Sequence, residues 1–136
     1  MTNSLFVYGS LMFSQVMHHV TGRTFSGCSA SIEGYARFLV RGEHYPGIVP
    51  FCQMRTTGML YRAVPHHTLT CLDRFEGALY KRQNVRIRLF NGSRVWAYAY
   101  VIRPSSRHIL STHPFEPETF FNQHLEKFLN TYRPYR

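Results

Sequence analysis

Cysteine is scarce in this 136-residue chain, and its few cysteines form no recognisable set. Cys28, Cys52 and Cys71 are odd in number and widely spaced, without a Cys-x-x-Cys pair. This pattern argues against a disulfide framework and against a cysteine zinc site, because both need paired or closely spaced cysteines. We therefore expect the chain to work in a reducing compartment.

The sequence also lacks a long apolar run. No basic segment precedes an apolar core near the N-terminus, and Tyr8-Gly9-Ser10 interrupts the only candidate. A secretory leader and a membrane-spanning helix both require longer apolar runs. These absences predict a cytoplasmic protein without a membrane partner.

Acidic residues are also few. Asp and Glu together number 7 against 16 Lys and Arg, so the formal net charge is +9, and Asp73 is the single aspartate. An excess of positive charge favours anionic partners, such as nucleic acid, an anionic membrane surface or an acidic small molecule. Because carboxylates are few, one that lies among apolar residues is a candidate functional group.

Apolar and aromatic residues are plentiful. Hydrophobic residues make up 44% of the chain and aromatic residues 15%, which is typical of a folded globule. The length suits one domain with a real core. We therefore expect a single domain over residues 1–136.

The clearest local signal is a short apolar strand over Leu5–Tyr8 that stops at a turn. Gly9 ends it, because a residue without Cβ can adopt backbone angles that others avoid. After such a turn, the N–H groups of Gly9, Ser10 and Leu11 can point outward together and bind an anion or oxyanion. A turn without a binding role is the alternative.

Periodicity and turn residues predict the remaining elements. We expect helices over residues 13–20, 65–77 and 117–132, and strands over 28–40, 57–64, 80–90 and 94–102. Asn91-Gly92 should join the last two strands as a hairpin, and Gly34 should bend or bulge the first. Residues 45–50 should form a rigid proline-flanked turn that either closes two strands or presents Tyr45 to a pocket. Residues 104–117 should be a turn-rich connection.

The C-terminal helix expected over 117–132 is amphipathic. One side carries Phe121, Leu125, Phe128, Leu129 and Tyr132, which predicts core packing and not a cofactor site. Arg133 and Arg136 then form a small basic tail.

The helix expected over 65–77 is chemically unusual. At 100° per residue, Leu69, Leu72 and Phe75 define an apolar arc, Glu76 falls inside it, and Arg74 points away. Burial and the negative end of the helix dipole would both raise the pKa of Glu76 and allow it to take and give a proton. The alternative, equally weighted by the pattern, is a glutamate that is solvated or paired with an arginine.

Four motifs occur in order along the chain, namely Phe6-Val7-Tyr8-Gly9-Ser10-Leu11, Tyr45-Pro46-Gly47-Ile48-Val49-Pro50, Gly58-Met59-Leu60-Tyr61, and Leu72-Asp73-Arg74-Phe75-Glu76 followed by Tyr80-Lys81-Arg82. As an ordered set over residues 5 to about 102, they resemble the gamma-glutamylcyclotransferase-like family. The similarity is to its avirulence-induced-gene-like and gamma-glutamylamine cyclotransferase branch. The helix expected over 117–132 lies outside this resemblance.

The resemblance implies an α+β fold, a small mixed β-barrel of about five to seven strands with a few surrounding helices and a pocket at one mouth. It implies that Tyr8, Gly9, Ser10 and Leu11 hold a gamma-glutamyl group through backbone N–H groups. It also implies that Glu76 is the catalytic carboxylate, and it assigns pocket-lining roles to Tyr45 and Tyr80.

The reaction that the resemblance implies is a cyclisation. The alpha-amine of a gamma-glutamyl amide attacks the gamma-carbonyl, which gives 5-oxoproline and a free amine without metal or cofactor. A monomer would suffice. The released group is left open, because free gamma-glutamyl amino acids, glutathione, gamma-glutamyl-lysine and gamma-glutamyl-protected intermediates share the recognised half.

Other functions remain as alternatives. A noncatalytic small-molecule-binding module on the same fold is the main one, although such a module has no reason to keep a carboxylate facing its pocket. A basic nucleic-acid-binding protein is less favoured, because arginines beside aromatic residues on the hairpin more often mark cross-strand packing. A serine hydrolase using Ser10 lacks a G-x-S-x-G turn, and His66-His67 lack a third metal ligand.

Overall fold

The computed structural model describes residues 2–132 and is built around a closed five-stranded β-barrel. Its strands are β1 (Thr2–Val7), β2 (Gly27–Val40), β3 (Pro46–Pro65), β4 (Tyr80–Leu89) and β5 (Arg94–Ile102). They follow the order β3-β1-β5-β4-β2, and pairing of β2 with β3 closes the barrel. β1 and β5 are parallel and the other pairs are antiparallel, so the expected mixed α+β barrel is confirmed.

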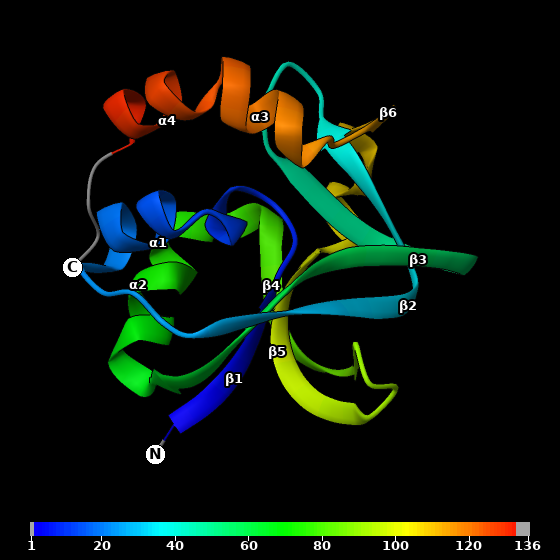
Figure 1. The fold of residues 1–136 in the computed structure, drawn as a ribbon. Coiled ribbons are helices and arrows are strands. Elements are labelled where there is room, and N and C mark those ends of the chain that lie inside the picture. Colours follow the sequence, from blue (N-terminus) through cyan, green and yellow to red (C-terminus); the bar gives the residue numbers. More distant parts are fainter. Residues whose placement is uncertain (1, 133–136) are drawn as a thin grey trace.

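Short helices cover one flank and one end of this barrel. They are α1 (Ser14–Thr21), α2 (His66–Glu76), α3 (Pro117–Gln123) and α4 (Leu125–Thr131), with 3-10 turns η1 (Ser10–Met12), η2 (Gly77–Leu79) and η3 (Pro104–Ile109). Figure 1 shows α1 and α2 in contact beside the barrel, with α3 and α4 above them. Within residues 2–132, none of the helices has the length and apolar character needed to cross a membrane. The basic tail expected at Arg133 and Arg136 lies outside the described residues.

The prediction of a turn over residues 45–50 was wrong. These residues open the 20-residue strand β3, in which Pro46 pairs with Leu39 and Pro50 pairs with Tyr35. The turn lies just before them, where the Val40 N–H donates to the Tyr45 carbonyl at 3.0 Å. Proline is tolerated as the first residue of a strand and beside bulges, and a register shift at Gly34 supplies the bulge.

The C-terminal part also differs from expectation. Residues 104–117 contain η3 and a sixth strand, β6 (Leu110–Pro114), which pairs with the end of β2. The single helix expected over 117–132 is broken at His124, whose φ of −126° is not helical. This break shifts the helical phase, so that Phe120 is buried and Phe121 is 46% exposed.

Strand β1 lies between two parts of the hydrophobic core. Leu5 and Val7 face the helices, whereas Phe6 and Tyr8 point into the barrel. Alternation of side chains along a strand explains this division. The strand therefore links the barrel interior to the helical flank at the point where it enters the turn at Gly9.

The contact between β1 and β3 is tight at Gly58, which is buried in β3. A Cβ atom at this position would lie 2.2 Å from the Val7 carbonyl oxygen and 2.8 Å from the Phe6 ring. Because the obstacle is partly backbone, a side chain here requires the two strands to separate.

We therefore expect Gly58→Ala to lower the free energy of unfolding by about 1–3 kcal/mol, the usual cost of overpacking a core. Urea unfolding followed by circular dichroism would measure this change. Thr57→Ala, at the preceding and exposed position, is the matched control and should change stability by less than about 1 kcal/mol. Equal stability of the two variants would refute the steric argument.

Candidate active site

A cavity of about 90 Å³ lies where β1 ends, between the barrel and helices α2 and α4. Its lining includes every residue that the sequence nominated, namely Tyr8, Gly9, Ser10, Leu11, Tyr45, Glu76 and Tyr80. It also includes Phe6, Val7, Pro46, Phe75, Tyr100, Phe128 and Tyr132. Residues far apart in the chain are thus brought together around one small pocket.

The turn after β1 forms one part of this lining. The Met12 N–H donates to the Gly9 carbonyl at 3.0 Å, and the Phe13 N–H donates to the Ser10 carbonyl at 3.1 Å. The N–H groups that precede a first helical bond lack an intrahelical partner. The residues from Gly9 to Leu11 stand at this position of η1, and all three line the cavity.

Two features favour glycine at position 9. Its backbone angles, φ −126° and ψ −135°, belong to neither the helical nor the extended region, as expected for a glycine that ends the strand. What excludes a side chain is the ring of Pro46, because a Cβ atom on Gly9 would lie 2.8 Å from the Pro46 Cδ. Close packing of β3 against the turn thus fixes this glycine.

Arg37 lies behind the turn and was missed by sequence analysis. Its Nη1 donates to the Tyr8 carbonyl at 2.7 Å and to the Thr57 carbonyl at 3.1 Å, and its guanidinium lies 5.3 Å from the centre of the Phe115 ring. Burial lowers the pKa of Arg37. The Tyr8 carbonyl and the Gly9 N–H belong to one trans peptide group and point in opposite directions. Because Arg37 holds the carbonyl, the Gly9 N–H points away from Arg37.

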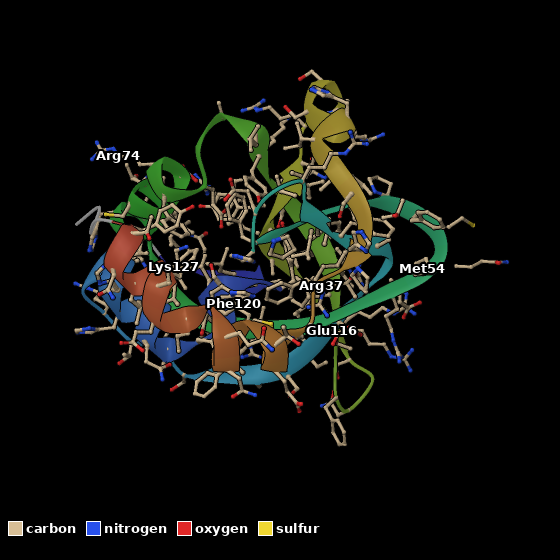
Figure 2. The ribbon with its side chains drawn as sticks, turned by 90° about the horizontal axis from the view of Figure 1, so that it is seen from above. Arg37, Met54, Arg74, Glu116, Phe120 and Lys127 are labelled. Atoms are coloured by element: carbon tan, nitrogen blue, oxygen red, sulfur yellow. The ribbon has the colours of Figure 1, made fainter. Side chains whose placement is uncertain are left out.

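Glu76 is the last residue of α2 and is partly buried. Leu69 and Leu72 on the same helix are fully buried, so the predicted apolar arc is confirmed. Figure 2 shows Arg74 projecting outward from α2, as expected. The helix ends here because Gly77 follows with a φ of 76°, a conformation that favours glycine.

The carboxyl group of Glu76 has an unusual titration. Burial, and to a smaller extent the charge of Asp73, raises the pKa of Glu76 from 4.5 to about 8. Among the residues that the structure describes, none forms an ion pair or hydrogen bond with the Glu76 carboxyl group. The alternative of a glutamate paired with an arginine therefore does not apply.

Asp73 itself is held by two partners at the surface end of the site. Arg82 contacts its carboxylate through Nε at 2.9 Å and Nη2 at 3.2 Å, and the Tyr100 hydroxyl donates to it at 2.7 Å. Burial and this hydrogen bond raise the pKa of Tyr100. Asp73 thus keeps a fixed position one helical turn before Glu76.

The tyrosines around the cavity act as neutral walls. The Tyr8 hydroxyl donates to the Tyr100 carbonyl at 2.6 Å, and the Tyr80 hydroxyl donates to the Pro46 carbonyl at 2.7 Å. Burial raises the pKa of both phenols well above 10, and burial with the nearby charge of Glu43 raises that of Tyr45 to about 12. None of these hydroxyls ionises at neutral pH, so Glu76 is the group of the lining suited to proton transfer there.

Helix α4 supplies a wall that sequence analysis assigned to the core alone. Phe128 packs against Phe75 and Tyr132, with ring centres 6.1 and 4.4 Å away. All three side chains line the cavity. The aromatic spacing of Phe128 and Tyr132 was the available signal, but it does not distinguish a core position from a pocket wall.

Two other groups of residues that the sequence singled out lie outside this cavity. The arginines of the β4–β5 hairpin pack on cross-strand aromatic rings, with Arg82 4.6 Å from the Tyr98 ring centre and Arg86 5.2 Å from that of Trp96. Over residues 2–132, no three His, Cys, Asp or Glu side chains gather as a metal site would require.

The chain is similar to known proteins. Residues 5–118 match a family described as gamma-glutamyl cyclotransferase, AIG2-like. The chain is 34% identical over 91 residues to AIG2-like protein D of Arabidopsis thaliana. The matched region covers 67% of this chain and 60% of the length of that relative.

Solved structures show the same fold. A solution structure of an Arabidopsis thaliana protein superimposes with a TM-score of 0.74 at 27% identity, covering 96% of this chain and 79% of the other. A structure titled gamma-glutamyl cyclotransferase has a TM-score of 0.68 at 15% identity, covering 98% and 89% of the two chains. At that identity, the second comparison supports the fold alone.

The raised pKa of Glu76 predicts a pH-dependent stability. Between pH 4.5 and 8 the unfolded state loses this proton while the folded state keeps it, so the free energy of unfolding falls as pH rises. The slope from this group is at most about 1.4 kcal/mol per pH unit. Glu76→Gln cannot ionise, so its stability relative to the original chain should grow from pH 5 to 8 and then level.

Thermal and urea unfolding of both proteins from pH 5 to 9 would test this expectation. Glu126→Gln, at an exposed position on α4, is the matched control. The difference in free energy of unfolding between this variant and the original chain should not change with pH. A stability difference for Glu76→Gln that does not vary with pH would contradict the assigned burial of its charge.

Proposed function

This chain belongs to the gamma-glutamyl cyclotransferase, AIG2-like family, and on that premise we propose that it converts a gamma-glutamyl amine or amide into 5-oxoproline and a free amine. The observation that carries the proposal is the position of Glu76. Its carboxyl group, with a pKa near 8, lines the same small cavity as the turn from Gly9 to Leu11. A proton-transfer group and an anion site are the two parts that this cyclisation needs.

In the proposed complex, the turn holds the acidic half of the substrate. Backbone N–H groups of the residues from Gly9 to Leu11 would donate to the alpha-carboxylate or to the oxyanion that develops on the gamma-carbonyl. Arg37, whose positive charge lies behind the Tyr8–Gly9 peptide, supports an anion on this side. Tyr8, Tyr45 and Tyr80 would shape the cavity so that the substrate adopts its folded conformer.

Glu76 would act as general base and then as general acid. The substrate's alpha-ammonium group lowers the pKa of the nearby carboxyl, so Glu76 is ionised when it accepts the first proton. The freed amine attacks the gamma-carbon, a new C–N bond closes the five-membered ring, and the original amide C–N bond breaks. The two protons lost by the attacking nitrogen leave with the released ammonium.

No nucleophile from the protein is required, because the attack is intramolecular. The contribution of the protein is to hold the reacting atoms together and to exclude extended conformers. The proposal needs neither metal nor cofactor, and it needs neither nucleic acid nor membrane. A cytoplasmic monomer is sufficient for it.

Release of 5-oxoproline from a panel of gamma-glutamyl amines and dipeptides tests the reaction directly. We expect turnover by the original chain and a loss of roughly a hundredfold or more in kcat for Glu76→Gln, since general acid–base groups contribute about that much. Glu126→Gln is the matched control and should retain full activity. Binding without turnover across the panel would instead identify a noncatalytic binding module on this fold.

The pH dependence of kcat/KM gives a second test. Because Glu76 must be ionised in the free protein, kcat/KM should rise with pH up to about 8. It should fall again where the substrate ammonium loses its proton. A profile that is flat between pH 6 and 8, measured under kcat/KM conditions, would contradict Glu76 as the base.

A further inference from the structure

One wall of the cavity is formed by aromatic side chains from α2 and α4. We call Phe75, Phe128 and Tyr132 the aromatic wall. Phe75 meets Phe128 at 71° and Tyr132 at 69°, both edge to face, with ring centres 6.1 and 5.9 Å apart. Phe75 and Tyr132 are partly exposed, and all three side chains line the cavity, so the wall is not merely core.

The cavity contains little charge. Among its described lining residues, Glu76 is the single charged side chain. Asp73, one turn earlier on α2, does not line the cavity and is already bound by Arg82 and Tyr100. Under the proposed reaction Glu76 serves the alpha-ammonium, so no second carboxylate of the lining remains for a further positive charge.

We propose that the released amine is one whose remaining part is uncharged and aromatic or apolar, seated against the aromatic wall. This inference rests on the proposed function. A ring or alkyl chain gains by leaving water and by contact with aromatic side chains. A second ammonium, as in a lysine or diamine conjugate, would lose its hydration there without a counter-charge.

The wall is poorly arranged to enclose a cation in place of an apolar group. Aromatic cages for ammonium groups present several ring faces to one point. Here Phe75 makes edge-to-face contacts with both Phe128 and Tyr132. The rings therefore pack against one another and do not turn their faces toward one common point. The overall charge of +9 further disfavours a cationic substrate.

Two matched pairs of substrates test the inference. Gamma-glutamyl-pentylamide and gamma-glutamyl-5-aminopentylamide differ by one terminal ammonium, and gamma-glutamyl-phenethylamide and gamma-glutamyl-phenylalanine differ by one carboxylate. We expect kcat/KM for 5-oxoproline release to favour the uncharged member of each pair by about tenfold or more. Equal rates, or preference for either charged member, would overturn the inference while leaving the proposed reaction intact.

A variant of the wall adds a second readout. Phe128→Leu keeps an apolar side chain but removes the ring, so kcat/KM for the phenethylamide should fall about 3- to 10-fold, and further than that for the pentylamide. Phe121→Leu, 46% exposed on α3, is the matched control and should alter neither. Phe75→Leu replaces Phe128→Leu if thermal unfolding shows that the latter has not folded.

Failure of the proposed function is recognised separately. If neither these four amides nor the wider panel of gamma-glutamyl amines and dipeptides releases 5-oxoproline, the reaction is refuted, and dissociation constants of the same pairs from calorimetry then report the preference of the wall. Tighter binding of the uncharged members supports an apolar subsite, and equal or reversed affinities refute it.

Discussion

The constraint on which this site depends is the placement of one carboxylate at the end of a short helix, in a setting that opposes its charge. Glu76 follows two fully buried leucines on α2, and Gly77 ends the helix before the chain enters β4. The helix position, the glycine stop and the barrel strand therefore all fix where this carboxylate lies. An ordinary surface glutamate would be ionised throughout the neutral range and would return a proton poorly.

The strong positive charge of the described part of the chain lies outside the cavity. Among the described lining residues there is no lysine, arginine or histidine. The arginines of β4 stack on aromatic rings of β5 or pair with Asp73 and Glu33. Arg37 acts from behind, through the Tyr8 carbonyl, and not by direct exposure to the cavity. Charge thus surrounds the site, and the site itself stays largely apolar.

Sequence reasoning identified those features that depend on neighbouring residues. The Gly9 turn, the arc of α2 and the Asn91-Gly92 hairpin are local patterns, and the structure contains all three. Features that depend on distant partners were missed or misassigned. Arg37 is one of 14 arginines by sequence, and only folding brings it to Tyr8. The break at His124 and the pairing of β6 with β2 likewise follow from packing, and the local periodicity does not encode them.

The cavity draws on residues both inside and beyond the part of the chain that the family matches. The turn and Glu76 lie within the first 80 residues, whereas Phe128 and Tyr132 come from a segment beyond the residues matched by the family. α4 is not part of the barrel, and a histidine of α1, His19, meets the Tyr132 carbonyl at its end. Under the proposed function, the C-terminal segment can therefore diverge in sequence and change the accepted amine without disturbing the chemistry.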